Sequence, residues 1–185
     1  QLLLNGSEKT HLAKNPLMSG WVDALIETFP DARFVVMMRN PAECIPSCLK
    51  LVQANWRGRG WEAEDYGKSL EILTRISFEH FRHPREVLAG HPQTPQIVVD
   101  YRDLTVAPGD TVLAVYAALG IEVSGPFDAW LRTQGEREKN HQSRFEYSLG
   151  EFLLSGEEIY HQLPEFYARC QWEAPAVPEE HKYAG

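Results

Sequence analysis

The stretch FPDARFVVMMRNPAECIPSC, residues 29–48, changes character at its centre. Residues 32–38 form a short and mostly apolar run, which is typical of a strand buried on both faces in a parallel sheet. Arg39 ends this run, and an Asn-Pro turn leads into a segment that carries Ser47 eight residues after the arginine. The stretch therefore predicts a central strand, a charge at its carboxyl end, and a helix that starts at Pro41.

The pattern around this stretch alternates between helix and strand. Residues 96–101, QIVVDY, form a second buried-strand pattern. Apolar spacing and breakers predict helices over residues 16–29, 41–56, 62–82, 108–120, 125–134 and 155–170, the last as two short helices. Pro46 predicts a bend or a late start in the second of these helices. We therefore expect an α/β fold, in which a parallel sheet is flanked by helices through right-handed crossovers.

Ligands bind at the carboxyl ends of the strands in such sheets, which is where Arg39 is expected. A guanidinium suits a phosphate, and the N-terminus of the next helix adds partial positive charge and free N–H groups. Ser47 adds a hydroxyl donor if the chain bends back at Pro46. In the alternative interpretation, Arg39 pairs with a carboxylate at the sheet edge and Ser47 faces solvent.

Composition limits the class of protein. A chain of 185 residues suits one domain, which we place at residues 1–172, with a poorly ordered tail at 173–185. The net charge of -8 argues against non-specific nucleic-acid binding. Residues 31–60 nevertheless hold five basic and two acidic side chains, an excess that attracts a small anion.

The three cysteines suggest a reducing compartment, so a cytoplasmic location is expected. Cys44 and Cys48 are four residues apart on a predicted helix, where a disulfide is geometrically poor. The sequence shows no metal-ligand spacing, no apolar run of membrane-spanning length and no signal peptide. We therefore expect neither a metal nor a membrane segment in this chain.

Residues 29–48 resemble the 3′-phosphate-binding motif of sulfotransferases that use 3′-phosphoadenosine-5′-phosphosulfate (PAPS). In that motif a strand leads into Arg-Asn-Pro or Arg-Asp-Pro, and a serine follows eight residues after the arginine. Arg39, Asn40, Pro41 and Ser47 match it. Further similar motifs follow in the family's order from residue 12 to about 170. The resemblance implies a P-loop NTPase-like sulfotransferase fold.

The same resemblance implies roles for particular residues. Arg39 and Ser47 would bind the 3′-phosphate of PAPS. Tyr101, at the end of the second strand, would lie near the nucleotide, although a tyrosine that only caps the core is an equal alternative. Lys14 matches a family lysine that ends the preceding strand and neutralises charge on the bridging oxygen as the sulfuryl group leaves. A solvated surface lysine is the alternative for Lys14.

His11 is a second candidate for a catalytic role. The sequence KTHL, residues 9–12, resembles the Lys-Thr-His-Leu of cytosolic sulfotransferases, in which the histidine is the general base. The spacing to Arg39, however, identifies Lys14 rather than Lys9 as the family lysine. This assignment places His11 earlier on the strand, and a structural histidine is the alternative.

The family's glycine-rich loop, which binds the 5′-phosphosulfate, has no counterpart between Gln1 and Lys14. The chain therefore resembles the C-terminal part of a longer sulfotransferase, and we expect an unpaired strand edge or open apolar groove beside residues 33–38. The predicted reaction moves a sulfuryl group from PAPS to a hydroxyl or amine of a small-molecule, glycan or peptide acceptor. The alternatives are a non-catalytic fold that binds a nucleotide 3′-phosphate and a P-loop kinase-like relative, which the missing Walker motif weakens.

Overall fold

The computed structural model describes residues 10–139 and 148–173. Two parallel strands, β1 (Phe34–Met38) and β2 (Gln96–Asp100), form the sheet within these residues. The remaining elements are η1 (Pro16–Trp21), α1 (Val22–Thr28), α2 (Pro41–Gly58), α3 (Ala63–Ala89), α4 (Tyr101–Val106), α5 (Pro108–Ala118), α6 (Gly125–Glu138), η2 (Leu149–Phe152), α7 (Gly156–Gln162) and α8 (Pro164–Cys170). The predicted parallel sheet flanked by helices is confirmed.

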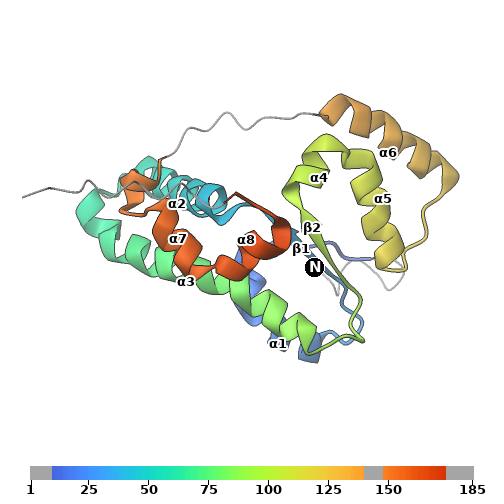
Figure 1. Cartoon of the computed structure of the whole chain (residues 1–185), viewed down its shortest axis with the longest axis horizontal. Coiled ribbons are helices and arrows are strands. Elements are labelled where there is room, and N and C mark those ends of the chain that lie inside the picture. The colour runs from blue at the N-terminus through green and yellow to red at the C-terminus, as the bar shows by residue number, and fades with distance from the viewer. Residues whose placement is uncertain (1–9, 140–147, 174–185) are drawn as a thin grey trace, which may run out of the picture.

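The helices cover the sheet in two groups (Figure 1). On one side, α2, α3, α7 and α8 surround the main core, to which β1 contributes Met38 and the partly buried Val36. Ile159 of α7 and Leu163, which directly follows that helix, have no exposed surface. On the other side, α5 packs against β2, and α6 packs against α5. The strands therefore lie between a large helical layer and a small one.

The small layer leaves part of the sheet uncovered. Successive side chains of a strand point to opposite faces, so Val35 and Met37 face away from the main core. Val35 is 40% exposed and Met37 is 48% exposed, whereas Val99 of β2 is 5% exposed because α5 covers it. β1 pairs only with β2 among the described residues. Among residues 10–139 and 148–173, the predicted unpaired edge and open apolar surface are present beside β1.

Three local expectations need correction. The strand that Lys14 was expected to end is absent from residues 10–15, which are irregular. The helix after Arg39 does not start late, since α2 begins at Pro41 and continues through Pro46. Pro46 is the sixth residue of α2, so it lacks the N–H that would bond to the Ala42 carbonyl, and its ring is buried in the core. α3 runs past its predicted end and includes Pro84.

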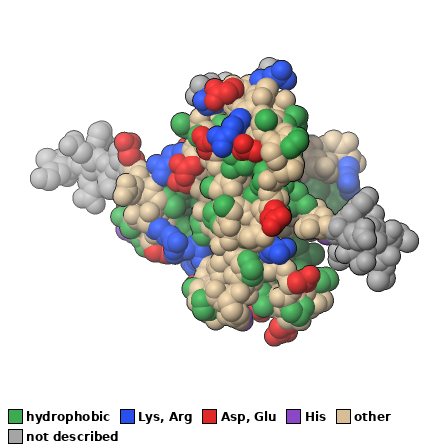
Figure 2. All heavy atoms as spheres, turned by 90° about the vertical axis from the view of Figure 1, so that its right-hand side faces the viewer, with side chains coloured by type: hydrophobic (Ala, Val, Ile, Leu, Met, Phe, Trp, Pro, Cys, Tyr) green, Lys and Arg blue, Asp and Glu red, His purple; other side chains and the backbone are tan. Residues whose placement is uncertain are grey.

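The surface around α5 and α6 is mixed in charge. Figure 2 views the molecule from that side and shows acidic and basic side chains interspersed with hydrophobic ones. Arg132, for example, lies 3.0 Å from Asp110 and also pairs with Asp128. The face that Figure 2 shows therefore presents no continuous basic surface of the kind that nucleic acids require.

None of the helices described here combines the length and the hydropathy needed to cross a membrane. The three cysteines are free thiols, and Cys44 and Cys48 lie one turn apart on α2 as expected. The two short C-terminal helices are also confirmed. Ser155 caps the first of them, since its hydroxyl accepts from the Glu158 N–H at 3.1 Å. The predicted tail at 173–185 lies almost wholly outside the described residues, and the domain boundary stays a prediction.

Candidate functional site

The strand register brings the two strand-end residues together. Met38 pairs with Asp100 at the last step of the parallel ladder, and each strand ends there. Arg39 and Tyr101 are therefore the first residues after the carboxyl ends of the two strands and lie on the same side of the sheet, although they are far apart in the sequence. This is the carboxyl end of both strands, where ligands of α/β sheets bind.

Contacts with Tyr101 and Glu43 help to orient the Arg39 guanidinium. The guanidinium carbon lies over the Tyr101 ring, 5.0 Å from the ring centroid. The Arg39 Nε donates a hydrogen bond to Oε2 of Glu43, one helical turn further on, at 3.0 Å. The Arg39 side chain is 25% exposed, so it is partly accessible from solvent. This carboxylate partner belongs to the first turn of α2.

The start of α2 is capped by its own residues. Asn40 is the N-cap, and its side chain accepts from the Ala42 N–H at 3.0 Å. The N–H groups of Glu43 and Cys44 both donate to the Asn40 carbonyl, at 2.9 and 2.8 Å. Pro41 has no N–H at all. The expectation of free N–H groups is therefore wrong, because the cap consumes them; the helix dipole remains.

Ser47 lies on the same face of α2 as Glu43. The two residues are four apart on the helix. Arg39, which precedes the N-cap Asn40, joins them through its bond to Glu43, and we call these three residues the α2 row. Ser47 is half-buried, and its hydroxyl has no hydrogen-bond partner among the residues that the structure describes. The row holds both side chains that the sequence assigned to a phosphate. Their convergence on a single ligand stays a prediction.

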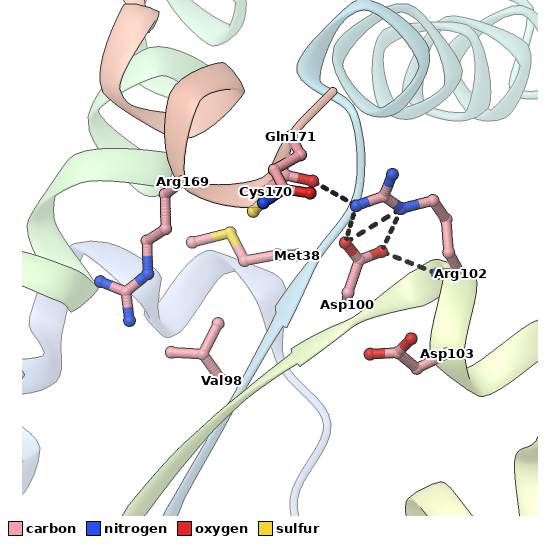
Figure 3. Close-up of a pocket in the computed structure, with 8 residues that line it drawn as sticks. All are labelled: Met38, Val98, Asp100, Arg102, Asp103, Arg169, Cys170 and Gln171. Atoms are coloured by element: carbon pink, nitrogen blue, oxygen red, sulfur yellow. Dashed lines mark hydrogen bonds and ion pairs between the residues drawn. The ribbon is translucent and has the colours of Figure 1, made fainter. Parts of the chain in front are cut away.

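An open pocket of about 330 Å³ lies between the carboxyl ends of the strands and α8 (Figure 3). Its floor is Met38 and Val98, and Arg169 of α8 lines the end opposite Asp100. The Arg102 guanidinium bonds to both Asp100 oxygens and to the Cys170 carbonyl. These bonds fasten the C-terminal helix to the end of β2.

Two groups near the strand ends have shifted pKa values. Burial raises the pKa of the Asp100 carboxyl, but hydrogen bonds and positive charge from Arg102 outweigh it, so the pKa lies below its usual range. Burial, with a smaller contribution from Cys48, raises the pKa of the Cys44 thiol. A thiol with a raised pKa is protonated near neutral pH, which argues against Cys44 as a nucleophile.

Lys14 and His11 lie apart from this arrangement of contacts. Both are exposed, in the irregular segment that precedes η1. Neither makes a hydrogen bond or an ion pair with another residue in the described part of the chain. The contacts described above therefore join Arg39, Tyr101 and Glu43, and neither Lys14 nor His11 takes part in them. Nothing in the structure tests their chemical roles.

Two parts of the site were not predicted from the sequence. Glu43 is a partner of Arg39, and the four-residue spacing on a predicted helix was the available signal. The Asp100–Arg102 pair carries an equally local signal, since an aspartate at a strand end commonly accepts from the N–H two residues later, here at 2.8 Å. The bond from Arg102 to Cys170 had no local signal.

Comparison with known proteins agrees with this geometry. A family model described as "Sulfotransferase family" matches residues 3–125, which include both strands, Arg39, Ser47 and Tyr101. The chain belongs to the sulfotransferase family. No solved structure matches this sulfotransferase chain significantly. No group of His, Cys, Asp and Glu within residues 10–139 and 148–173 is arranged as a metal site.

Two curated relatives are similar to the chain. Both are described as omega-hydroxy-beta-dihydromenaquinone-9 sulfotransferase Stf3, one from Mycobacterium bovis and one from Mycobacterium tuberculosis. Each is 27% identical over 123 residues, which cover 66% of this chain. The matched part spans 31% of the length of either relative.

Proposed function

We propose that the chain binds the 3′-phosphate of PAPS as part of an enzyme that transfers a sulfuryl group to a hydroxyl acceptor. The observation that supports the proposal is the contact of Arg39 with Tyr101 at the carboxyl ends of two paired parallel strands. Family membership supports the choice of a sulfuryl donor over other phosphorylated ligands.

The residues present suit a phosphate. A guanidinium offers a planar fork of donors that matches phosphate oxygens, and its charge persists at any physiological pH. Ser47 offers a hydroxyl one helical turn beyond Glu43, and the α2 N-terminus adds its dipole although its N–H groups are used. In this proposal, Arg39 and Ser47 select nucleotides that carry a 3′-phosphate.

Sulfuryl transfer requires charge neutralisation more than covalent chemistry from the protein. The acceptor oxygen bonds to sulfur while the bond from sulfur to the 5′-phosphate oxygen breaks, and that oxygen gains negative charge. Lys14 is the proposed cation for this charge. The acceptor loses its proton in the same reaction, and His11 is the proposed base.

The proposed acceptor is a small molecule with a hydroxyl group. The support comes from the two relatives, whose printed name describes an omega-hydroxylated dihydromenaquinone as the acceptor. A shared hydroxyl chemistry is the part of that name that we carry to this chain. The amine, glycan and peptide acceptors considered from the sequence lack comparable support.

Calorimetry on the 185-residue chain tests the donor assignment. We expect adenosine 3′,5′-bisphosphate to bind more tightly than adenosine 5′-monophosphate, and Arg39→Ala to weaken the bisphosphate by about ten-fold to one-hundred-fold. Arg33→Ala is the matched control, since Arg33 is an exposed arginine just before β1. Equal affinity for the two nucleotides in the wild-type chain would contradict the proposal.

A transfer assay tests the reaction itself. The full gene product is incubated with PAPS and a hydroxylated prenyl quinone, and the sulfated product is detected by mass spectrometry. A matched quinone without the hydroxyl is the acceptor control. Binding of the bisphosphate without transfer to any hydroxyl acceptor would favour a non-catalytic nucleotide-binding protein.

A further inference from the structure

We infer that Tyr101 is a positioning residue, which acts on the 3′-phosphate through Arg39 and not by contact with the nucleotide base. The inference rests on the proposed function and adds the source of its selectivity. Its structural basis is the Arg39 clamp, which we define as the Arg39 guanidinium together with the Tyr101 ring and the Glu43 carboxylate.

The clamp restrains the guanidinium in two independent ways. The Tyr101 ring lies against it at 5.0 Å between the guanidinium carbon and the ring centroid, which restricts its tilt. The hydrogen bond from Nε to Glu43 at 3.0 Å restricts its rotation about its own axis. The two restraints come from different elements, α4 and α2, whose first turns are set by the paired strand ends.

Orientation matters because a guanidinium binds a phosphate best through two parallel N–H bonds. That geometry needs a defined plane, which a long and flexible arginine side chain does not supply by itself. An aromatic face supplies the plane and also attracts the cation, most strongly where water is partly excluded. Arg39 is only 25% exposed, so part of the water is excluded here.

The Tyr101 side chain forms neither the cap of α4 nor the hydrogen bonds between the strands. Tyr101 is half-buried and is the first residue of α4, so its position is set by the end of β2. The α4 cap is made by Asp100, whose side chain accepts from the Arg102 N–H. Replacement of the Tyr101 side chain therefore leaves the cap and the strand ladder in place.

The decisive measurement compares two nucleotides that differ only in the 3′-phosphate. Tyr101→Leu removes the aromatic face, and we expect it to weaken adenosine 3′,5′-bisphosphate by about five-fold while adenosine 5′-monophosphate is unchanged. A direct contact with adenine would weaken both nucleotides equally. An equal loss for both, or no loss for either, would overturn the inference.

Tyr101→Phe keeps the aromatic face and removes the hydroxyl, so we expect it to retain the wild-type preference between the nucleotides. A loss as large as that of Tyr101→Leu would assign the effect to the hydroxyl and overturn the inference. Arg85→Ala is a control for stacking elsewhere, because Arg85 lies 4.7 Å from the Phe166 ring centroid and outside the site. We expect no change in preference from it.

A double-mutant cycle separates positioning from general loosening of the fold. If Tyr101 acts through Arg39, Tyr101→Leu has no further effect on bisphosphate binding once Arg39→Ala is present. Additive losses would overturn the inference. A wild-type chain without preference for the bisphosphate would refute the proposed function as well, whereas a preference that Tyr101→Leu leaves unchanged would refute only the inference.

Discussion

Arg39 combines a charge, a ring and a carboxylate in one small volume. Its Nε bonds to Glu43 and its guanidinium carbon lies over the Tyr101 ring, so the cation has partners within the chain itself. The carboxylate also reduces the net positive charge at this position. Selectivity for a phosphate then depends on orientation and not on charge alone.

Lys14 gives a prediction about turnover. In the full gene product, Lys14→Ala should lower kcat by about one-hundred-fold or more, since a positioned cation stabilises charge that develops in the transition state. Binding of PAPS should change much less, and steady-state kinetics at saturating PAPS measures the difference. Lys9→Ala is the neighbouring control. Near wild-type turnover would identify Lys14 as a solvated surface residue.

Individual site residues were more predictable than their contacts. Arg39, Ser47 and Tyr101 stand at ends of sequence patterns, so their positions after a strand or within a helix could be read from the chain. The stacking of Arg39 on Tyr101 depends on strand register, which single-sequence patterns do not specify. The hydrogen bonds of the first N–H groups of α2 depend on the geometry of the cap, which the sequence pattern did not specify either.

Among the elements, helix starts were predicted best. The sequence predicted a helix start at Pro41 and two short helices within residues 155–170. The structure has α2 from Pro41, α7 from Gly156 and α8 from Pro164. The expected strand before η1 was wrong because it rested on resemblance and not on an apolar run. α3 extends beyond its predicted end at residue 82 because two later apolar residues, Val87 and Leu88, continue its buried face.

The contact of α5 with α6 depends on two glycines. A Cβ at Gly135 would lie 2.6 Å from the Gly109 nitrogen, so the helices can approach this closely only without side chains there. Gly135→Ala should therefore lower the free energy of unfolding by about 1–3 kcal/mol, measured by urea denaturation. Gly67→Ala, in an open position on α3, should raise it by about 0.5–1 kcal/mol. Equal effects would argue against close packing.

For the whole molecule, the bonds from Arg102 to Asp100 and Cys170 predict a loss of stability in acid. The folded-state pKa of Asp100 is depressed, so its contribution is fully present above the unfolded pKa of about 3.9 and is lost as the pH falls through the lower folded value. Urea denaturation between about pH 5 and pH 3 should show this loss, and Asp100→Asn should reduce its slope.

Asp31→Asn is the control for the acid experiment. Asp31 is exposed and forms no ion pair with another described residue, so the slope should match that of the wild-type chain. An unchanged slope in Asp100→Asn would mean that other carboxylates cause the acid sensitivity.

The uncovered side of β1 predicts self-association. Replacing Val35 and Met37 together by threonine keeps strand propensity and removes exposed apolar surface. The onset of light scattering should move to higher protein concentration, while the free energy of unfolding changes by less than about 1 kcal/mol. Leu51→Gln, a single exposed apolar position on α2, should have little effect. Unchanged scattering in the double variant would exclude β1 as the associating surface.

The pairing of β1 with β2 also has a consequence for the speed of folding. Residues 39–95 separate the strands, so the ladder closes only after a long segment has brought its ends together. Helices α2 and α3 can form from local contacts well before this event. The ligand-binding edge is therefore assembled late during refolding, and until then both apolar strands are exposed to other chains. Slow refolding at low protein concentration should give more active molecules than rapid dilution at high concentration.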